Sequence, residues 1–217
     1  MLQKIPACVD AVMVVDNNST DDTLKVANKY GWAKSPEEKR FFFYIRQVIK
    51  RGYGVAYKYA FNELMMGDVD IIVAMDADDS YPLDEVERCV RFLLDNGLDF
   101  VSCSRFPLKD KKSMTPINYV GNRFLTMVAN ELFGLELHDI TTGMWVMRHW
   151  ILPACLYYSD GMQFTIEWKL WGAVFSDFCR FGETHISYHP RIGEVKQKWL
   201  RDGFKYLWTL IKMRCER

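Results

Sequence analysis

Short apolar runs and amphipathic segments alternate along the first half of the chain. The apolar runs predict four buried β-strands, at residues 11–15, 41–45, 69–75 and 100–104. The segments between them carry apolar residues at helical spacing, most regularly at Val86, Cys89, Val90, Leu93 and Leu94. Because alternating strands and helices are typical of βαβ units, the pattern predicts an α/β fold with a mostly parallel sheet flanked by helices.

The second half of the chain is less regular. Apolar spacing predicts helices at 117–134, 163–174 and 199–213, with strands at 144–147 and 184–188. In the first of these helices, the apolar side chains are expected to face a core or an acceptor groove; they are Val120, Phe124, Met127, Val128 and Leu132. With 217 residues, 49% of them hydrophobic, residues 1–217 are expected to form one domain with a sizeable core.

Three carboxylates stand directly after the apolar run at 69–75. Asp76, Asp78 and Asp79 precede Ser80 and Pro82, residue types that favour a helix start. In an open α/β sheet, ligands bind beyond the carboxyl ends of the strands, and two aspartates there can share a hard divalent cation. Taken alone, the same residues fit an acidic turn that caps the next helix equally well.

Two further turns combine strand ends with polar or glycine residues. Asp16 ends the strand at 11–15, ahead of helix-capping residues at 19–22, and can accept hydrogen bonds from a base or a ribose. Arg51, Gly52 and Gly54 follow the strand at 41–45. Glycines there would let the backbone approach a phosphate, with Arg51 as the charged contributor. The alternative is an ordinary strand-to-helix turn with two glycines.

Six short motifs carry a resemblance to a known family. They are D-N-N-S-T-D-D-T at 16–23, R-G-Y-G-V-A at 51–56, D-A-D at 76–78, S-R-F at 104–106, D-I-T-T-G-M at 139–144 and R-I-G-E-V-K at 191–196. In this order they resemble the family 2 glycosyltransferases with a GT-A (Rossmann-like) fold. They look most like the branch that transfers sugars to dolichyl or undecaprenyl phosphate.

The resemblance implies an enzyme with two halves, in which residues 1–106 bind the nucleotide and residues 107–217 bind the acceptor. It implies that Mg²⁺ or Mn²⁺ on Asp76 and Asp78 neutralises the diphosphate of a nucleotide diphosphate sugar. The implied nucleotide-binding residues are Asp16, Arg51 and Asp76, and the implied catalytic residues are Asp139, Arg191 and Lys196. Because an acceptor phosphate is already ionised at neutral pH, Asp139 is expected to orient rather than to deprotonate.

The chain departs from the family pattern at three places. The family's first strand, which ends in a P-x-Y-N-E-type loop, is absent, so a neighbouring strand is expected to have an exposed edge. Trp145 stands where the family often has an arginine, and Val195 stands where it usually has a serine.

Two elements of the second half keep two interpretations each. Glu167, among aromatic residues of the helix at 163–174, is either an active-site carboxylate or a surface charge. The C-terminal amphipathic helix at 199–213 either packs on the domain or lies in a headgroup layer, since tryptophans and basic residues suit that layer. Its apolar residues include Trp199, Phe204, Trp208 and Ile211, and its basic residues include Arg201, Lys205 and Lys212.

Charge and cysteine usage narrow the range of partners. The 28 basic and 28 acidic residues balance, so no nucleic-acid partner is expected. Six scattered cysteines without zinc-binding spacing indicate reduced thiols in a cytoplasmic protein. Since no stretch of 18 apolar residues is present, any membrane contact is expected to be peripheral, at the cytoplasmic face.

Two rival functions remain beside transfer to a polyprenyl phosphate. The first is a glycosyltransferase that acts on a glycan hydroxyl, which would need a carboxylate base. The second is a non-catalytic subunit that binds a nucleotide sugar and lacks the first strand.

Overall fold

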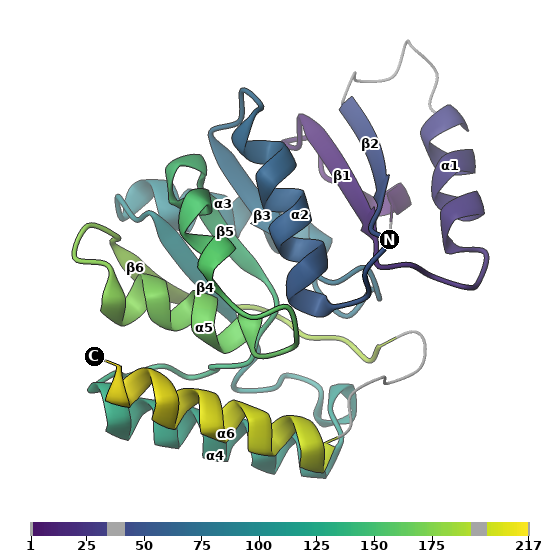
Figure 1. Cartoon of the computed structure of the whole chain (residues 1–217). Helices are drawn as coiled ribbons and strands as arrows, with labels where there is room; N and C mark the ends of the chain where they lie inside the picture. The colour runs from purple at the N-terminus through teal and green to yellow at the C-terminus, as the bar shows by residue number, and fades with distance from the viewer. Residues whose placement is uncertain (1, 34–41, 192–198, 217) are drawn as a thin grey trace.

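The fold is that of a computed structural model, which describes residues 2–33, 42–191 and 199–216. Strands and helices alternate from the start, as the sequence predicts (Figure 1). The strands are β1 (Ala11–Asp16), β2 (Phe42–Gln47), β3 (Ile71–Ala74), β4 (Phe100–Ser104), β5 (Trp145–Arg148) and β6 (Phe181–His185). The α-helices are α1 (Thr23–Ala33), α2 (Tyr53–Met65), α3 (Val86–Asp95), α4 (Pro116–Phe133), α5 (Phe164–Leu170) and α6 (Trp199–Cys215).

The strands form two sheets. β1 and β2 pair in parallel, from Ala11 opposite Phe42 to Asp16 opposite Gln47. The other four strands are ordered β3-β5-β4-β6, with β5 antiparallel to both neighbours and β6 parallel to β4. Strands β3, β4 and β6 therefore run in one direction and β5 runs against them. This arrangement confirms the predicted α/β class.

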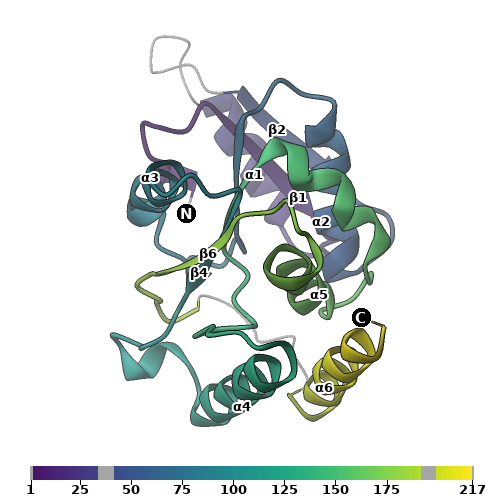
Figure 2. The same ribbon diagram turned by 90° about the vertical axis from the view of Figure 1, so that its left-hand side faces the viewer.

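Helices cover both faces of the four-stranded sheet, and the side chains alternate accordingly. Along β5, Trp145 and Met147 pack towards α2 and α5, whereas Val146 packs towards α3. Phe100 and Val101 of β4 divide in the same way, because successive strand residues point to opposite faces. Figures 1 and 2 show α3 on one side of the sheet and α2 and α5 on the other.

Helices α4 and α6 lie side by side at one end of the molecule, beyond α5 (Figures 1 and 2). Their inner faces form a third core cluster with α5, which includes Leu125, Ala129 and Phe133 of α4, Ile166 and Leu170 of α5, and Tyr206 and Leu210 of α6. Of the α4 residues expected to face a core or an acceptor groove, Val128 and Leu132 pack against this cluster. Val120, Phe124 and Met127 do not face the core and are 65%, 49% and 55% exposed. Among the described residues, no helix combines the length and the apolar character needed to cross a membrane.

Two segments of the second half differ from the sequence predictions. The strand expected at 184–188 lies at Phe181–His185, because Phe181 and Gly182 pair with β4 although the sequence there is mostly polar. After β6, Ile186 and Tyr188 remain buried, so burial still alternates while the ladder has ended. The segment His149–Tyr157, for which the sequence predicts no element, is a 3₁₀ helix packed on α2.

Candidate active site

The acidic motif lies where β3 ends, with Asp76 partly buried against two tyrosines of α2. The hydroxyl of Tyr57 donates to Asp76 Oδ1 at 3.4 Å, and the hydroxyl of Tyr53 lies 3.5 Å from that of Tyr57. Burial raises the pKa of Asp76 from 3.8 to about 6, and the negative charge of Asp78 adds to this shift, whereas Arg191 opposes it. The carboxylates of Asp76 and Asp78 therefore repel each other, and a positive charge between them is favoured.

Asp78 is held by contacts to both of its oxygens. The Nε of Arg191 lies 2.5 Å from Oδ2, and the backbone N–H of Ser80 donates to Oδ1 at 3.1 Å. The hydroxyl of Ser80 also donates to Oδ1. The structure thus brings together Asp76, Asp78 and Arg191, three residues that the sequence analysis placed in one site.

Asp79 belongs to a different contact. Its backbone has φ of 61°, a left-handed conformation that aspartate tolerates, and its carboxylate lies 2.8 Å from Nζ of Lys4. The pKa of Asp79 is lowered mainly by its hydrogen bond to Lys4. The third carboxylate of the motif therefore attaches the N-terminal segment to this turn.

Gly143 stands against the acidic pair, at the point where the chain enters β5. Its N–H donates to the hydroxyl of Tyr81 at 2.7 Å. A Cβ at this position would lie 2.7 Å from the hydroxyl of Tyr53 and 3.4 Å from Oδ2 of Asp76. Only glycine fits here without displacing the groups that surround Asp76.

Asp139 is completely buried and forms an ion pair with Arg105, which sequence reasoning did not single out. Nε and Nη2 of Arg105 donate to its two oxygens at 2.7 and 2.9 Å. Burial alone would raise the pKa of Asp139, but Arg105, with Lys169 adding to its effect, holds it below the ordinary value. Arg105 also lies 5.2 Å from the ring centre of Tyr188. The only sequence signal for Arg105 is its place in the S-R-F motif.

The predicted nucleotide-binding residues Asp16 and Arg51 lie on two turns that are joined to each other. Asp16 accepts from the N–H of Ser19 at 3.1 Å and from the side chain of Gln47 at 3.1 Å. The guanidinium of Arg51 donates to the carbonyl of Asn18 at 2.9 and 3.1 Å, which ties the turn after β2 to the turn after β1. Lys196, the third predicted catalytic residue, lies outside the described residues.

The two glycines beside Arg51 are explained by close packing of the protein backbone. A Cβ on Gly52 would lie 2.6 Å from the carbonyl oxygen of Asp160, and one on Gly54 would lie 2.1 Å from that of Ser159. The sequence suggested close approach of a phosphate here, and the close approach seen is that of the loop at 159–160.

Glu167 has a structural role that neither sequence interpretation described. It accepts from the N–H and the hydroxyl of Ser159, both at 2.7 Å. It therefore fixes the loop on which Gly52 and Gly54 rest.

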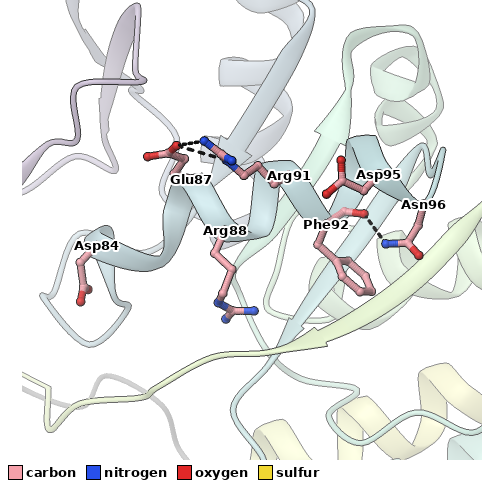
Figure 3. A pocket seen from close by; sticks show the side chains of 7 residues that line it. All are labelled: Asp84, Glu87, Arg88, Arg91, Phe92, Asp95 and Asn96. Atoms are coloured by element: carbon pink, nitrogen blue, oxygen red, sulfur yellow. Dashed lines mark hydrogen bonds and ion pairs between the residues drawn. The ribbon is translucent and has the colours of Figure 1, made fainter.

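A separate shallow hollow runs along the outer side of α3 (Figure 3). Its lining comes from one stretch of chain, and Glu87 and Arg91 pair there at 2.7 Å. None of the predicted site residues lines it.

In the described ranges, no three His, Cys, Asp or Glu side chains gather as a metal centre, so a cation at Asp76 and Asp78 would need further ligands from a substrate.

Comparison with known proteins gives consistent matches. Residues 2–154 match the family model described as glycosyl transferase family 2. The chain is 31% identical over 199 residues to a low-salt glycan biosynthesis hexosyltransferase of Haloferax volcanii, covering 90% of this chain and 44% of that protein. It is 28% identical over 186 residues to a dolichyl-phosphate hexose transferase of the same organism, covering 86% of this chain and 73% of the relative.

A solved structure shares the fold. Glucosyl-3-phosphoglycerate synthase from Mycobacterium tuberculosis, in complex with Mn²⁺, uridine diphosphate and glucosyl-3-phosphoglycerate, matches with a TM-score of 0.65. The match covers 99% of this chain and 74% of that one, at 16% sequence identity.

Proposed function

Since the chain belongs to glycosyl transferase family 2, we propose that it transfers a sugar from a nucleotide diphosphate sugar to a polyprenyl phosphate. The main support for this proposal is that the side chains of Asp76, Asp78 and Arg191 lie close together after the end of β3. Two carboxylates and one arginine suit a substrate that brings both a divalent cation and phosphate groups. The dolichyl-phosphate hexose transferase among the relatives supports the choice of acceptor.

The acidic pair fits Mg²⁺ or Mn²⁺. Both cations prefer oxygen ligands, and Mg²⁺ is commonly bound by one or two carboxylates together with substrate phosphates. The repulsion between Asp76 and Asp78, and the guanidinium already in contact with Asp78, indicate a position that favours positive charge. When bound, the cation supplies charge neutralisation for the diphosphate leaving group.

The nucleotide is proposed to bind across the turns after β1, β2 and β3. Asp16 would accept from the ribose or base, and Arg51 would face the diphosphate. The hydrogen bonds from Arg51 to Asn18 hold together the two turns that carry these residues. Asp76 would contribute to nucleotide binding as well as to the cation.

The environment of Asp139 supports a phosphate acceptor over a glycan hydroxyl. A hydroxyl acceptor requires a base that can take its proton. Asp139 is unsuited to that role, because both of its oxygens are engaged by Arg105 and its pKa is lowered. A phosphate acceptor needs positive charge instead, which Arg191 supplies and which Lys196 would increase.

An apolar helical face is proposed to hold the protein at an anionic membrane surface, on its cytoplasmic side. On α6, Phe204, Trp208 and Ile211 are exposed at the spacing of one helix face, opposite the buried Tyr206, Leu210 and Met213. The exposed basic residues Arg201, Lys205 and Lys212 border this row.

A second exposed apolar row lies on the neighbouring helix α4 and consists of Ile117, Val120, Phe124 and Met127. Apolar rows bordered by basic residues are typical of helices in the headgroup layer.

A transfer assay tests the proposal directly. The folded protein is incubated with labelled uridine or guanosine diphosphate sugars, polyprenyl phosphate in detergent, and Mn²⁺. We expect label in the lipid fraction, its loss on chelation, and its loss in Asp78→Asn. Asp95→Asn, an exposed aspartate at the end of α3, serves as the matched control.

Other outcomes would identify the rival functions. Transfer to free sugars but not to polyprenyl phosphate would indicate a glycan hydroxyl acceptor. A folded protein that binds no nucleotide with Mn²⁺ present would contradict an enzymatic role.

A further inference from the structure

The contact between Arg191 and Asp78 competes with a divalent cation for the charge of the same carboxylate. A cation bound by Asp78 requires a carboxylate lone pair directed at it, at about 2.0–2.1 Å for Mg²⁺. Oδ1 of Asp78 already accepts the N–H and the hydroxyl of Ser80. Oδ2 is in contact with Nε of Arg191 at 2.5 Å. Oδ2 keeps a second lone pair, but a divalent cation bound there would lie close to the positive charge of Arg191, and their repulsion favours release of the arginine.

The chain around Arg191 allows such a movement without separating the residue from the site. The N–H of Ile186 donates to the carbonyl of Ser104 at 2.8 Å, and the N–H of His189 donates to the carbonyl of Ser80 at 2.9 Å. The backbone two residues before Arg191 is therefore attached to the acidic turn itself. The side chain of Arg191 is 34% exposed, which leaves solvent beside it for a rotation.

We propose that Arg191 is an exchangeable internal cation, which covers Asp78 in the free protein and moves to the substrate phosphates when cation and nucleotide bind. This inference rests on the function proposed above and describes how that site is regulated. In the free state the guanidinium neutralises Asp78. In the loaded state the divalent cation takes over that task and the released guanidinium binds a phosphate.

The chemistry of arginine favours this exchange. Its planar fork matches the oxygens of a phosphate with two parallel hydrogen bonds, so a phosphate is a strong partner for Arg191. Because this ion pair is partly exposed, its strength is modest: it opposes a cation that arrives alone, and a phosphate partner is enough to outweigh it. A phosphate that arrives with its cation offers Arg191 a better partner at the moment when Asp78 is needed elsewhere.

The exchange makes binding of cation and nucleotide mutually dependent. Without nucleotide, a cation must displace Arg191 into water and binds weakly. With nucleotide, Arg191 gains a phosphate, so the cation binds more tightly, and the nucleotide gains equally from the cation. The free protein is thereby kept from holding a divalent cation that has no substrate attached.

The variant Arg191→Gln distinguishes this exchange from a role in phosphate binding alone. The exchange predicts that the affinity for Mn²⁺ rises while the affinity for the nucleotide falls. We expect Mn²⁺ alone to bind roughly tenfold more tightly than in the parent, equivalent to about 1.4 kcal/mol. We expect Mn²⁺-dependent binding of uridine or guanosine diphosphate to weaken. Mn²⁺ binding is followed by electron paramagnetic resonance and nucleotide binding by calorimetry, and neither readout depends on turnover.

Two further variants complete the test. Arg91→Gln removes an arginine from an ion pair on the outer side of α3 and should change neither affinity. Asp78→Asn added to Arg191→Gln should abolish the tighter Mn²⁺ binding, which places that binding on Asp78. Thermal unfolding of each variant verifies that it is folded.

Mn²⁺ affinity that is unchanged or lower in folded Arg191→Gln would overturn the exchange. A phosphate-binding role alone would lower nucleotide affinity without raising Mn²⁺ affinity. The proposed function fails on a different result, namely parent protein that binds no nucleotide in the presence of Mn²⁺.

Discussion

Gly143 shows how closely the candidate site depends on single residues. The position lies against the hydroxyls of Tyr53 and Tyr81 and the carboxylate of Asp76, and none of these groups is near it in sequence. The motif at 139–144 placed Gly143 in the second half of the chain, and only the fold brings it to the acidic pair. A glycine whose neighbours come from α2 and from the segment after β3 cannot be recognised from local spacing.

Gly143→Ala tests this dependence. The added methyl group would push the hydroxyl of Tyr53 and the carboxylate of Asp76 from their positions, so we expect weaker Mn²⁺-dependent nucleotide binding. Overpacking of this kind costs about 1–3 kcal/mol of stability. Gly121→Ala in α4 is the control, because nothing lies within 4 Å of a Cβ there and alanine suits a helix better than glycine. Equal nucleotide affinities in the two variants would contradict this role for Gly143.

At the residue scale, the sequence predicted the position of the acidic pair. Aspartates at a strand end, together with the family resemblance, indicated a ligand site, and the structure places Asp76 and Asp78 after β3 beside Arg191. Their role in binding a cation stays a prediction. Arg105 was missed because its importance comes from burial beside Asp139, which spacing does not reveal. For Gly52 and Gly54 the sequence suggested that a phosphate approaches the glycine backbone. In the structure the protein backbone at 159–160 lies against these two glycines.

At the scale of elements, the segment after β6 is held to the rest of the molecule by Glu85. This residue belongs to the 3₁₀ turn Leu83–Glu85 before α3, and it accepts the N–H of Ser187 at 2.9 Å. Arg88 pairs with Glu85 and also donates to the carbonyl of His185. Burial alone would raise the pKa of Glu85, but its hydrogen bonds to Ser187 and Arg88 lower it from 4.5 to about 2. The segment that leads to Arg191 is thus fixed by a group that must stay ionised.

This arrangement predicts a pH dependence of stability. Because the pKa of Glu85 is lower in the folded than in the unfolded protein, its contribution is present above about pH 4.5 and is lost as pH falls towards 2. After allowance for solvent screening, we expect about 1 kcal/mol. The free energy of unfolding of Glu85→Gln, measured by urea between pH 2 and 6, should fall less on acidification than that of the parent. Parallel curves would rule out this contribution.

The apolar helical face gives the second prediction at this scale. Replacing Phe204 and Trp208 together by alanine should weaken binding to anionic liposomes in a sedimentation assay, because both side chains are 68% exposed or more. Phe178→Ala removes an aromatic side chain that is 86% exposed but lies outside α4 and α6, and should leave binding unchanged. Equal loss in both proteins would show that binding is not specific to this face. The side chain of Trp199, the other tryptophan of the predicted interfacial helix, is not among those described.

At the scale of the whole molecule, the alternation of apolar runs and amphipathic segments predicted the α/β class. It did not predict the order of the strands in the sheet. β5 lies between β3 and β4 and runs against both, although it follows β4 in the chain by about 40 residues. Such pairing depends on contacts between distant parts of the chain, which periodicity does not encode. The exposed row on α4 is a related case, because an apolar row at helical spacing does not reveal whether it faces a core or the surface.

The division into two sheets has a consequence for local unfolding of the protein. β1 and β2 are joined to each other through six paired positions, but within the described residues neither is hydrogen-bonded to the four-stranded sheet. They can therefore form a separate cooperative unit that unfolds at a lower free energy than β3 to β6. We expect amide hydrogens in β1 and β2 to exchange with deuterium at least about tenfold faster than those in β4 and β5. A nucleotide that contacts both Asp16 and Asp76 would connect the two units and should slow exchange selectively in β1 and β2. Substrate binding would then complete the folding of the nucleotide-binding half.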